Sequence, residues 1–308
     1  MKQLDAAITH SVWSAALPPL LSIEPGETIR IATSLGSGAR YRAGATTPAD
    51  ILEATRTSPG LALTGPIHIA GSEPGDVLDV ELLELVIDTW GYTTIAPGFG
   101  LLSDDFPDPA FRQWDLSDGR AAPFDERISV PLEPFLGAVG VAPPEGQVLS
   151  TIPPTRWGGN LDVRQMRVGS TIFLPVAVPG ALLSLGDAHG AQGDGEVCGT
   201  AIETSALASV RVTLHKGWRL AYPAIRTSDS SPSRAGPAYV TTGIGPDLYG
   251  AAQEAVRGMI DYLGHTHHLS REDAYILSSV AVDLRISEIV DRPNWVVSAS
   301  IPLRIFGP

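Results

Sequence analysis

Turn-forming residues recur along the whole chain, which contains 32 glycines and 26 prolines among its 308 residues. Both residue types interrupt helices, so this frequency argues against a helical bundle. Residues 23–31 and 72–80 show what the turns connect, because each places Pro-Gly directly before an alternating apolar run. Pro-Gly suits a type II turn, and the alternation buries one face of a strand. The sequence therefore predicts a mainly β protein with a few helices, arranged as a sandwich or barrel of several sheets.

The domain organisation follows from shifts in this pattern. Residues 107–154 are rich in proline and glycine and indicate long ordered connections carrying one or two short strands. The chain is predicted to be a single unit, 1–308, which can be divided into two β-rich sub-domains, residues 1–150 and residues 151–308. Helical spacing predicts helices at 248–263 and 271–280, forming a C-terminal hairpin. Asp247 is the expected N-cap of the first and Gly264 its stop, while Ser270 caps the second.

Charge and composition exclude several classes of function. The chain has 21 Lys and Arg against 34 Asp and Glu, a net charge of −13, which disfavours nucleic acid and anionic membranes as partners. A single cysteine excludes an intrachain disulfide framework. The first residues lack a signal-peptide pattern, and no uninterrupted apolar run is long enough to span a bilayer. These features predict a cytoplasmic protein.

One polar, glycine-rich segment stands out against apolar flanks: residues 180–204 read GALLSLGDAHGAQGDGEVCGTAIET. If a strand ends near His189, Asp187 and His189 project from the same face, where a carboxylate and an imidazole can bind one cation. Asp194 and Glu196 repeat that spacing. Oxygen and nitrogen ligands suit zinc, or calcium if oxygens dominate. Asp-x-His and Gly-Asp-Gly also occur as ordinary turns and caps, so the combination carries more weight than either pair alone.

Several motifs resemble the acetamidase/formamidase family. They are GGNLD at 158–162, LPVAVPGALLSLGDAH at 174–189, QGDGEVCGTAIET at 192–204, TGPI at 64–67, EPGD at 73–76, PGFG at 97–100 and DLRIS at 283–287. The resemblance covers nearly the whole chain and implies a β-rich fold, hydrolysis of small amides or γ-lactams, a divalent metal and self-association, with a dimer expected. Relatives usually carry a Trp-Asp-Asn-like stretch where this chain has Trp13-Ser14-Ala15. If that stretch lines the pocket in relatives, this protein accepts a different, larger or less polar amide.

The residues and the resemblance together predict a metal-dependent amidohydrolase of small linear or cyclic amides. Asp187, His189 and Glu203 are the predicted metal ligands, and Glu196 is the predicted general base. Asp194 would be its partner or a further ligand. The predicted substrate-binding residues are Gly158, Gly159, Asn160 and Gln192, with the Gly-Gly-Asn turn offering N–H groups to an oxyanion.

Two alternatives predict different behaviour. A thiol amidase would use Cys198 as its nucleophile, and it would be inactivated by thiol reagents but indifferent to chelators. A non-enzymatic, β-rich binding protein would use the acidic loop only to hold a stabilising cation, so removing the metal would lower stability without any turnover of amides.

Overall fold

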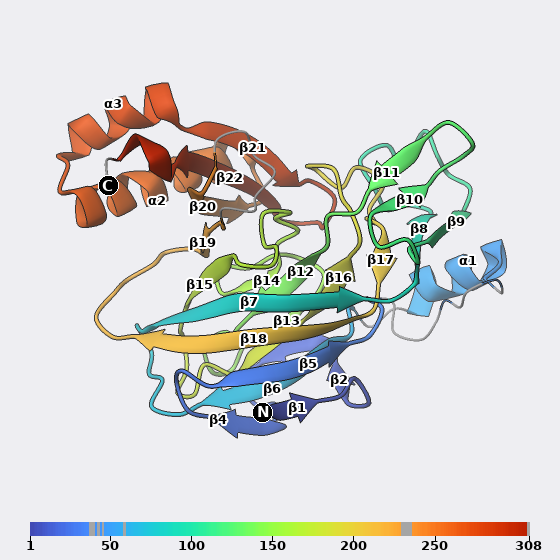
Figure 1. Ribbon diagram of the computed structural model, residues 1–308, viewed down its shortest axis with the longest axis horizontal. Helices are drawn as coiled ribbons and strands as arrows, with labels where there is room; N and C mark the ends of the chain where they lie inside the picture. The colour runs from blue at the N-terminus through green and yellow to red at the C-terminus, as the bar shows by residue number, and fades with distance from the viewer. Residues whose placement is uncertain (37–40, 42–43, 45, 58–59, 229–235, 307–308) are drawn as a thin grey trace.

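The computed structural model describes residues 1–36, 41, 44, 46–57, 60–228 and 236–306. Within these residues the protein is mainly β, as predicted, with two nine-stranded sheets, two small two-stranded sheets and three α-helices (Figure 1). The helices are α1 Pro48–Thr57, α2 Leu248–His267 and α3 Arg271–Ala281, and a short 3₁₀ turn, Leu303–Ile305, follows the last strand.

The strands are mostly short, as the density of turn residues predicts. In chain order they are β1 Lys2–Leu4, β2 Thr9–His10, β3 Val12–Ser14, β4 Leu21–Ile23, β5 Thr28–Thr33, β6 Leu63–Ile69, β7 Val77–Ile87, β8 Trp90–Ile95, β9 Ala110–Asp115, β10 Ala121–Pro123, β11 Ser129–Pro131, β12 Phe135–Gly140, β13 Val148–Ser150, β14 Gly158–Asn160, β15 Thr171–Pro175, β16 Leu183–His189, β17 Glu203–Thr204, β18 Ala206–His215, β19 Ala224–Arg226, β20 Ala238–Gly245, β21 Asp283–Glu288 and β22 Trp295–Pro302.

The first large sheet has the order β1-β5-β18-β7-β15-β19-β20-β22-β21. The two predicted turn-and-strand units supply β5 and β7, which lie on either side of β18. Gly26 and Gly75 precede these strands with φ of 93° each, the conformation that a type II turn requires. The alternation in β5 places Ile29 and Ile31 in the core.

The second large sheet has the order β14-β12-β16-β17-β8-β9, and β6 joins β16 to β2 and β4. Apolar side chains of both large sheets form one buried cluster, with Leu82 and Val210 from the first sheet and Leu136 and Leu185 from the second. Burying such side chains contributes about 1.5–3 kcal/mol each, so this shared interior stabilises the two sheets as a unit.

The segment 107–154 contains more structure than its composition indicates. The composition predicts one or two short strands, but the segment carries β9, β10, β11, β12 and β13. The strand β12 lies between β14 and β16 in the second sheet and is fully buried. Its sequence, FLGAVG, does not alternate because both of its faces are covered, which hides the usual strand signal.

Strands from either side of residue 150 are interleaved in both large sheets, since β7 pairs with β15 and β6 pairs with β16. A boundary at that residue therefore does not separate one sheet from the other. The division into sub-domains at residue 150 stays a prediction about folding units.

The two C-terminal helices pack together against β20 and β22 (Figure 1). Asp247 and Ser270 cap them as predicted, accepting hydrogen bonds from the backbone N–H groups of Gly250 and Asp273. The first helix continues past Gly264, because the left-handed residue that ends it is His268, whose N–H bonds to the Leu263 carbonyl. Helix α1 was not predicted. None of the helices in the described ranges combines the length and apolarity that crossing a membrane requires.

Candidate active site

Strand β16 carries Asp187 and His189 into the interior, as the sequence predicts. The Nε2 atom of His189 lies 3.3 Å from Oδ2 of Asp187 and 3.3 Å from Oε1 of Glu203. Glu203 comes from β17, where it lies directly opposite His189 in the ladder. All three side chains are buried, and their ligand atoms lie within 4.8 Å of one another. The arrangement can hold a cation between one imidazole and two carboxylates.

A glycine on the neighbouring strand makes room for this cluster. A Cβ on Gly137 of β12 would lie 2.5 Å from Oδ1 of Asp162, 2.7 Å from Oδ2 of Asp187 and 2.8 Å from Cε1 of His189. No other residue type fits at this position without displacing the polar side chains. Gly137 of β12 therefore contributes to the site because it has no side chain.

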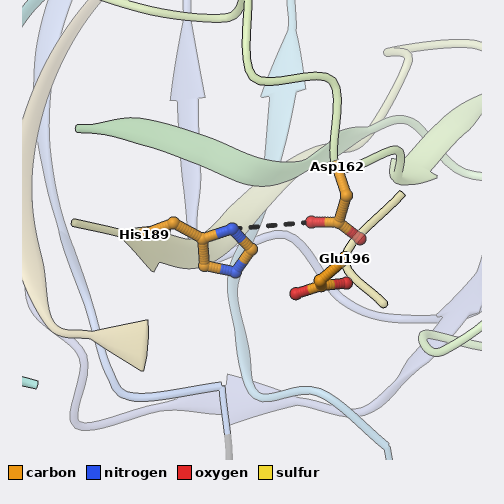
Figure 2. A group of neighbouring side chains, drawn as sticks. All are labelled: Asp162, His189 and Glu196. Atoms are coloured by element: carbon orange, nitrogen blue, oxygen red, sulfur yellow. Dashed lines mark ion pairs between the residues drawn. The ribbon is translucent and has the colours of Figure 1, made fainter. Parts of the chain in front are cut away.

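Asp162 is a member of the site that the sequence reasoning missed. It forms a second buried group with His189 and Glu196 (Figure 2), and its Oδ1 lies 3.7 Å from Nδ1 of His189. Burial, followed by the nearby charges of Asp187, Glu288 and Glu203, raises the pKa of Asp162 well above its ordinary value despite the opposing effect of His189. A carboxyl group between buried Leu161 and Val163 was the available signal, because such a group seldom lies in the core without a functional partner.

The backbone at the site is strained at three of its acidic residues. Asp162, Asp187 and Glu196 have φ of 48°, 56° and 47°, in the left-handed region that residues with a Cβ seldom adopt. Such conformations cost about 1–3 kcal/mol each and persist where the surrounding structure enforces them. The fold thus directs these three carboxyl groups toward one place at the expense of local backbone energy.

Gln192 orients the imidazole of His189. Its Nε2 group donates to the main-chain carbonyl of Asp162 at 2.9 Å, which leaves its Oε1 facing Nδ1 of His189 at 3.0 Å. An amide oxygen only accepts, so in the neutral ring Nδ1 carries the proton and Nε2 presents a lone pair toward Asp187 and Glu203. The sequence predicts a substrate-binding role for Gln192, but both ends of its amide are engaged within the protein and it does not line the neighbouring cavity, so its contacts favour positioning of His189.

The electrostatic field at His189 favours positive charge. Burial by itself would lower the pKa of this imidazole, but the carboxylates of Glu203 and Asp187 outweigh burial and raise it well above its ordinary value. The same carboxylates would favour a cation at Nε2, an atom without a hydrogen-bond partner in the structure. Both oxygens of Asp162 also lack hydrogen-bond partners. Orphaned buried polar atoms of this kind are typical of a site built for an ion.

Glu196 lies beside this cluster and lines a cavity. Its loop is attached to β21 by a hydrogen bond from the Gly195 N–H to the Ser287 carbonyl, at 2.9 Å. Burial, and then the charge of Asp162, raises the pKa of Glu196 well above its ordinary value, although His189 opposes the shift. A raised pKa makes the carboxylate a stronger base than that of an ordinary glutamate, which suits a general base.

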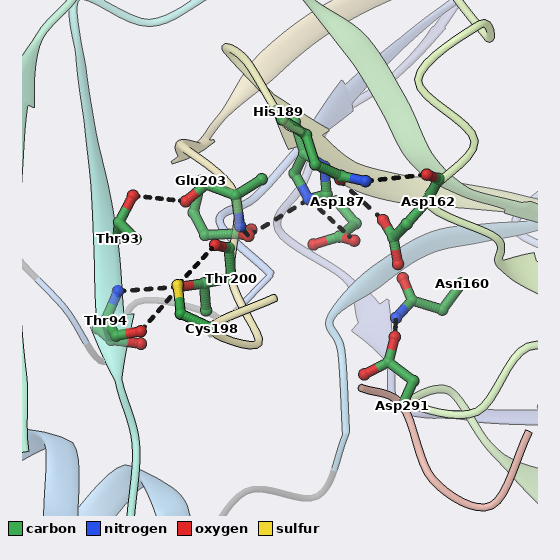
Figure 3. A network of polar contacts seen from close by, with 12 residues as sticks. Thr93, Thr94, Asn160, Asp162, Asp187, His189, Cys198, Thr200, Glu203 and Asp291 are labelled. Carbon is green, nitrogen blue, oxygen red and sulfur yellow. Dashed lines mark hydrogen bonds and ion pairs between the residues drawn. The ribbon is translucent and has the colours of Figure 1, made fainter. Parts of the chain in front are cut away.

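Asn160 and Asp291 form a second polar wall, which Figure 3 shows beside the histidine cluster. The Nδ2 group of Asn160 donates to Oδ2 of Asp291, and Oδ1 of Asn160 is buried without a partner. Glu288 accepts hydrogen bonds from the backbone N–H groups of Val290 and Asp291, which fixes the turn that presents Asp291. Burial, and then the charges of Glu288 and Asp162, raises the pKa of Asp291 well above its ordinary value.

A cavity of about 330 Å³ opens beside these residues. Four of the residues proposed from the sequence line it, namely Asn160, Asp187, Glu196 and Glu203, together with Asp291, which the sequence reasoning missed. His189 lies behind them and is only 1% exposed. The cavity thus brings together groups from β14, β16 and β17 and from the loops after β16 and β21.

Other predicted site residues lie outside this cavity. Asp194 is paired with Arg285 at 3.3 Å and belongs to neither buried group, so its predicted role beside Glu196 finds no support in the geometry. The Gly158 N–H donates to the Thr155 carbonyl at 3.1 Å, which removes it as an oxyanion donor. Gly159 packs against the Trp13 ring instead of the cavity.

The segment that departs from the family pattern lies in the core. Trp13 packs with Leu63 and Ala138, and no residue of the Trp13-Ser14-Ala15 stretch lines the cavity. Cys198 is also absent from the cavity wall, and its thiol donates to the Thr200 carbonyl at 3.4 Å (Figure 3). The Trp13-Ser14-Ala15 stretch therefore does not line the cavity in which a substrate would bind.

Comparison with known proteins identifies the family. A family model described as the acetamidase/formamidase family matches residues 2–150 and 145–308. This chain belongs to the acetamidase/formamidase family. A formamidase from Methylophilus methylotrophus is 27% identical over 96% of this chain and 89% of its own length. An acetamidase from Mycolicibacterium smegmatis is 29% identical over 75% of this chain and 71% of its own length.

A solved structure extends the likeness to three dimensions. The crystal structure of an acetamidase from Bacillus halodurans has a TM-score of 0.89 and 30% identity, and it covers 99% of this chain and 98% of its own. As a member of the acetamidase/formamidase family, the chain is a hydrolase that acts on carbon–nitrogen bonds other than peptide bonds. The buried carboxylates and histidine described above are its candidate active site.

Proposed function

We propose that this acetamidase/formamidase family member is a metal-dependent hydrolase of small linear or cyclic amides. The observation that carries the metal dependence is the buried group of Asp187, His189 and Glu203, which converges on one point with Nε2 of His189 unpartnered. Carboxylates surround the imidazole on both sides, and without a counter-charge such a cluster is costly to bury. A bound divalent cation offsets this cost.

The donor set fits zinc, because one imidazole and two carboxylates leave a coordination position for a reactant. Calcium prefers more oxygen ligands, and the nearby carboxyl groups of Asp162 and Glu196 make it the alternative. When bound, such an ion supplies Lewis acidity, which makes water more acidic and a carbonyl group more electrophilic. Asp187, His189 and Glu203 would hold it.

The remaining polar groups suit the proton transfers that amide hydrolysis needs. Glu196 lines the cavity with a raised pKa, so its carboxylate can accept a proton from water and then deliver it to the departing nitrogen. Oδ1 of Asn160, which is buried and unpartnered, can accept a hydrogen bond from the amide N–H of the substrate. The bond from Asn160 to Asp291 holds this oxygen in place.

The proposal is tested by metal analysis of the purified protein together with product assays on a panel of amides. Ammonia release is measured for short linear amides, and ring opening for γ-lactams, before and after chelation. We expect a bound divalent ion in the purified protein, loss of turnover on chelation and recovery when zinc is restored. The Asp187→Ala variant should lose both metal and turnover. Full activity in a metal-free preparation would exclude the proposal.

A further inference from the structure

The cavity extends well beyond the carboxylates along strand β8. Tyr92, Thr94 and Ala96 alternate along the chain and line the same wall. Tyr92 lies directly opposite Glu203 in the ladder between β8 and β17, so the wall begins at the histidine cluster. At about 3.3 Å per residue, it runs roughly 13 Å from Tyr92 to Ala96. An amide held at Glu196 and Glu203 therefore has a long channel in front of it.

The far part of this channel offers apolar surface. Phe99 lies over Gly199, where a Cβ would be 2.4 Å from the phenyl ring, so this glycine lets the ring close the wall. Tyr41 packs edge-on against Tyr92 with ring centroids 4.9 Å apart, and buried Ala54 of helix α1 belongs to the same cluster. Aromatic edges and faces of this kind favour a flat apolar group.

The backbone N–H and carbonyl groups of Thr94, in the middle of this wall, are paired with Thr200. The Thr94 N–H donates to Oγ1 of Thr200 at 2.9 Å, and the Thr200 hydroxyl donates to the Thr94 carbonyl at 3.0 Å. The loop that carries Phe99 is fixed to the Glu196 loop by a hydrogen bond from the Leu101 N–H to the Val197 carbonyl, at 2.9 Å. The wall is thus attached to the loop that carries Glu196, and the N–H and carbonyl groups of Thr94 already have hydrogen-bond partners within the protein.

The ionisable carboxyl groups among the described lining residues all lie at the reactive end of the cavity. Among its described lining residues the ionisable acids are Asp187, Glu196, Glu203 and Asp291, and no lysine or arginine is present. A carboxylate or phosphate on the far part of a substrate would meet no cationic side chain among the described lining residues. The described wall therefore favours an uncharged substituent.

We propose that the substrate is an uncharged amide whose acyl group carries a flat apolar substituent, of the arylacetamide class. This inference rests on the proposed amide hydrolysis and specifies its substrate. Pockets of about 300–1,000 Å³ enclose ligands far larger than formamide or acetamide, and this cavity reaches that range with about 330 Å³. A one- or two-carbon amide would leave the wall from Tyr92 to Phe99 in contact with water alone.

The test is a comparison of kcat/KM for formamide, acetamide, butyramide, phenylacetamide and the anionic amide succinamate. We expect kcat/KM to rise about fourfold for each added methylene, and to be at least about a hundredfold higher for phenylacetamide than for acetamide. Succinamate should be the poorest of the larger substrates. Equal or falling values from acetamide to phenylacetamide would overturn the inference while leaving the proposed amide hydrolysis intact.

A pair of matched variants locates the effect. Ala96→Leu adds bulk to the channel wall, whereas Ala110→Leu makes the same change on the exposed, neighbouring strand β9. The ratio of kcat/KM for phenylacetamide to that for acetamide should fall at least tenfold in Ala96→Leu and stay unchanged in Ala110→Leu. An unchanged ratio in both variants would show that the substituent does not lie along β8.

If no amide is hydrolysed, measurements of amide binding still test the channel separately from the proposed hydrolysis. In that event the proposed function fails, and calorimetry with phenylacetamide and acetamide still tests the channel. Phenylacetamide should bind to the wild-type protein at least tenfold more tightly than acetamide, and Ala96→Leu should reduce that difference. Equal binding of the two amides would overturn the inference.

Discussion

Glu196 has a buried side chain that lines the cavity, and its backbone has a strained, positive φ. Glu196→Gln keeps the shape of the side chain but removes its ability to accept a proton. We expect this variant to retain metal and fold while kcat falls by about 10²–10⁴, the usual share of general acid–base catalysis. Metal content, thermal unfolding and kcat measured on the same preparation check this.

The pH profile gives the same residue a second test. The general base must be ionised, so kcat/KM of the wild-type protein should rise with pH as Glu196 loses its proton. Its raised pKa places that rise at a higher pH than an ordinary glutamate would. The acid limb should disappear in Glu196→Gln. Loss of metal in the variant would instead make Glu196 a ligand, and near-wild-type turnover would remove it from the mechanism.

Cys198 separates the metal hypothesis from the thiol hypothesis. Its thiol contacts Thr200 and does not line the cavity, so Cys198→Ser changes only a local hydrogen bond. We expect kcat/KM to fall by less than about tenfold, which corresponds to roughly 1.4 kcal/mol in the barrier. Ammonia release with and without a thiol reagent measures this. A folded but inactive Cys198→Ser protein would support the thiol amidase.

At the scale of elements, strand β12 shapes the site through Gly137. The Gly137→Ala variant would place a Cβ within 2.8 Å of Asp162, Asp187 and His189. We expect it to lose most of its bound metal and to reduce kcat/KM by at least about a hundredfold, because a displacement near 1 Å has this effect in a positioned site. Gly245→Ala, where a Cβ meets no heavy atom within 4 Å, is the matched control.

The two glycine variants should differ in function more than in fold. Far-ultraviolet circular dichroism should show the native β signal in both, and metal analysis should separate them. If Gly137→Ala retained full metal and turnover, the space beside β12 would not be essential to the cluster.

The contact between the loop after β16 and strand β21 also explains how segments distant in sequence reach one site. Gly195 bridges to Glu288 of β21, and the turn after β21 carries Asp291 to Asn160 of β14. The first sheet therefore ends at the candidate active site, most of whose residues come from the second sheet and its loops. The glycine-rich loop after β16 connects the two sheets. Its Gly195 therefore has a structural role, contact with β21, in addition to any close approach to a ligand.

At the scale of the whole molecule, buried carboxyl groups make stability depend on pH. Glu288 is 0% exposed, and burial raises its pKa from 4.5 to about 7, although the backbone N–H groups of Asp291 and Val290 oppose the shift. The folded state thus holds a proton that the unfolded state releases above pH 4.5. Stability from this group is full below pH 4.5 and falls as the pH rises toward 7.

The expected loss is about 3 kcal/mol of unfolding free energy between pH 4.5 and 7 in the metal-free protein. Urea unfolding at the two pH values measures it. Glu288→Gln, which cannot ionise, should show a smaller decrease over the same interval. A decrease of the same size in the variant would assign the pH dependence to the other buried carboxyl groups.

The homodimer and the cytoplasmic location expected from the sequence stay predictions.

The sequence by itself determined the features that depend on neighbouring residues. Pro-Gly turns, alternating strands and the caps at Asp247 and Ser270 are local, because each depends on contacts a few residues apart. The Asp187 and His189 pair belongs to the same class, since two positions on one strand stay together wherever that strand packs. The fold class, the C-terminal hairpin and the centre of the site followed from these signals.

Only the tertiary structure decided which other polar groups reach that centre. Asp162 and Asp291 are distant in sequence from His189, and they arrive through the pairing of β12 with β14 and β16 and through the turn after β21. Packing between distant segments also pairs Asp194 with Arg285 and bonds Gln192 to the Asp162 carbonyl. The spacing of residues along a strand determines which of its side chains share a face. Packing between segments distant in sequence determines which other residues those side chains contact.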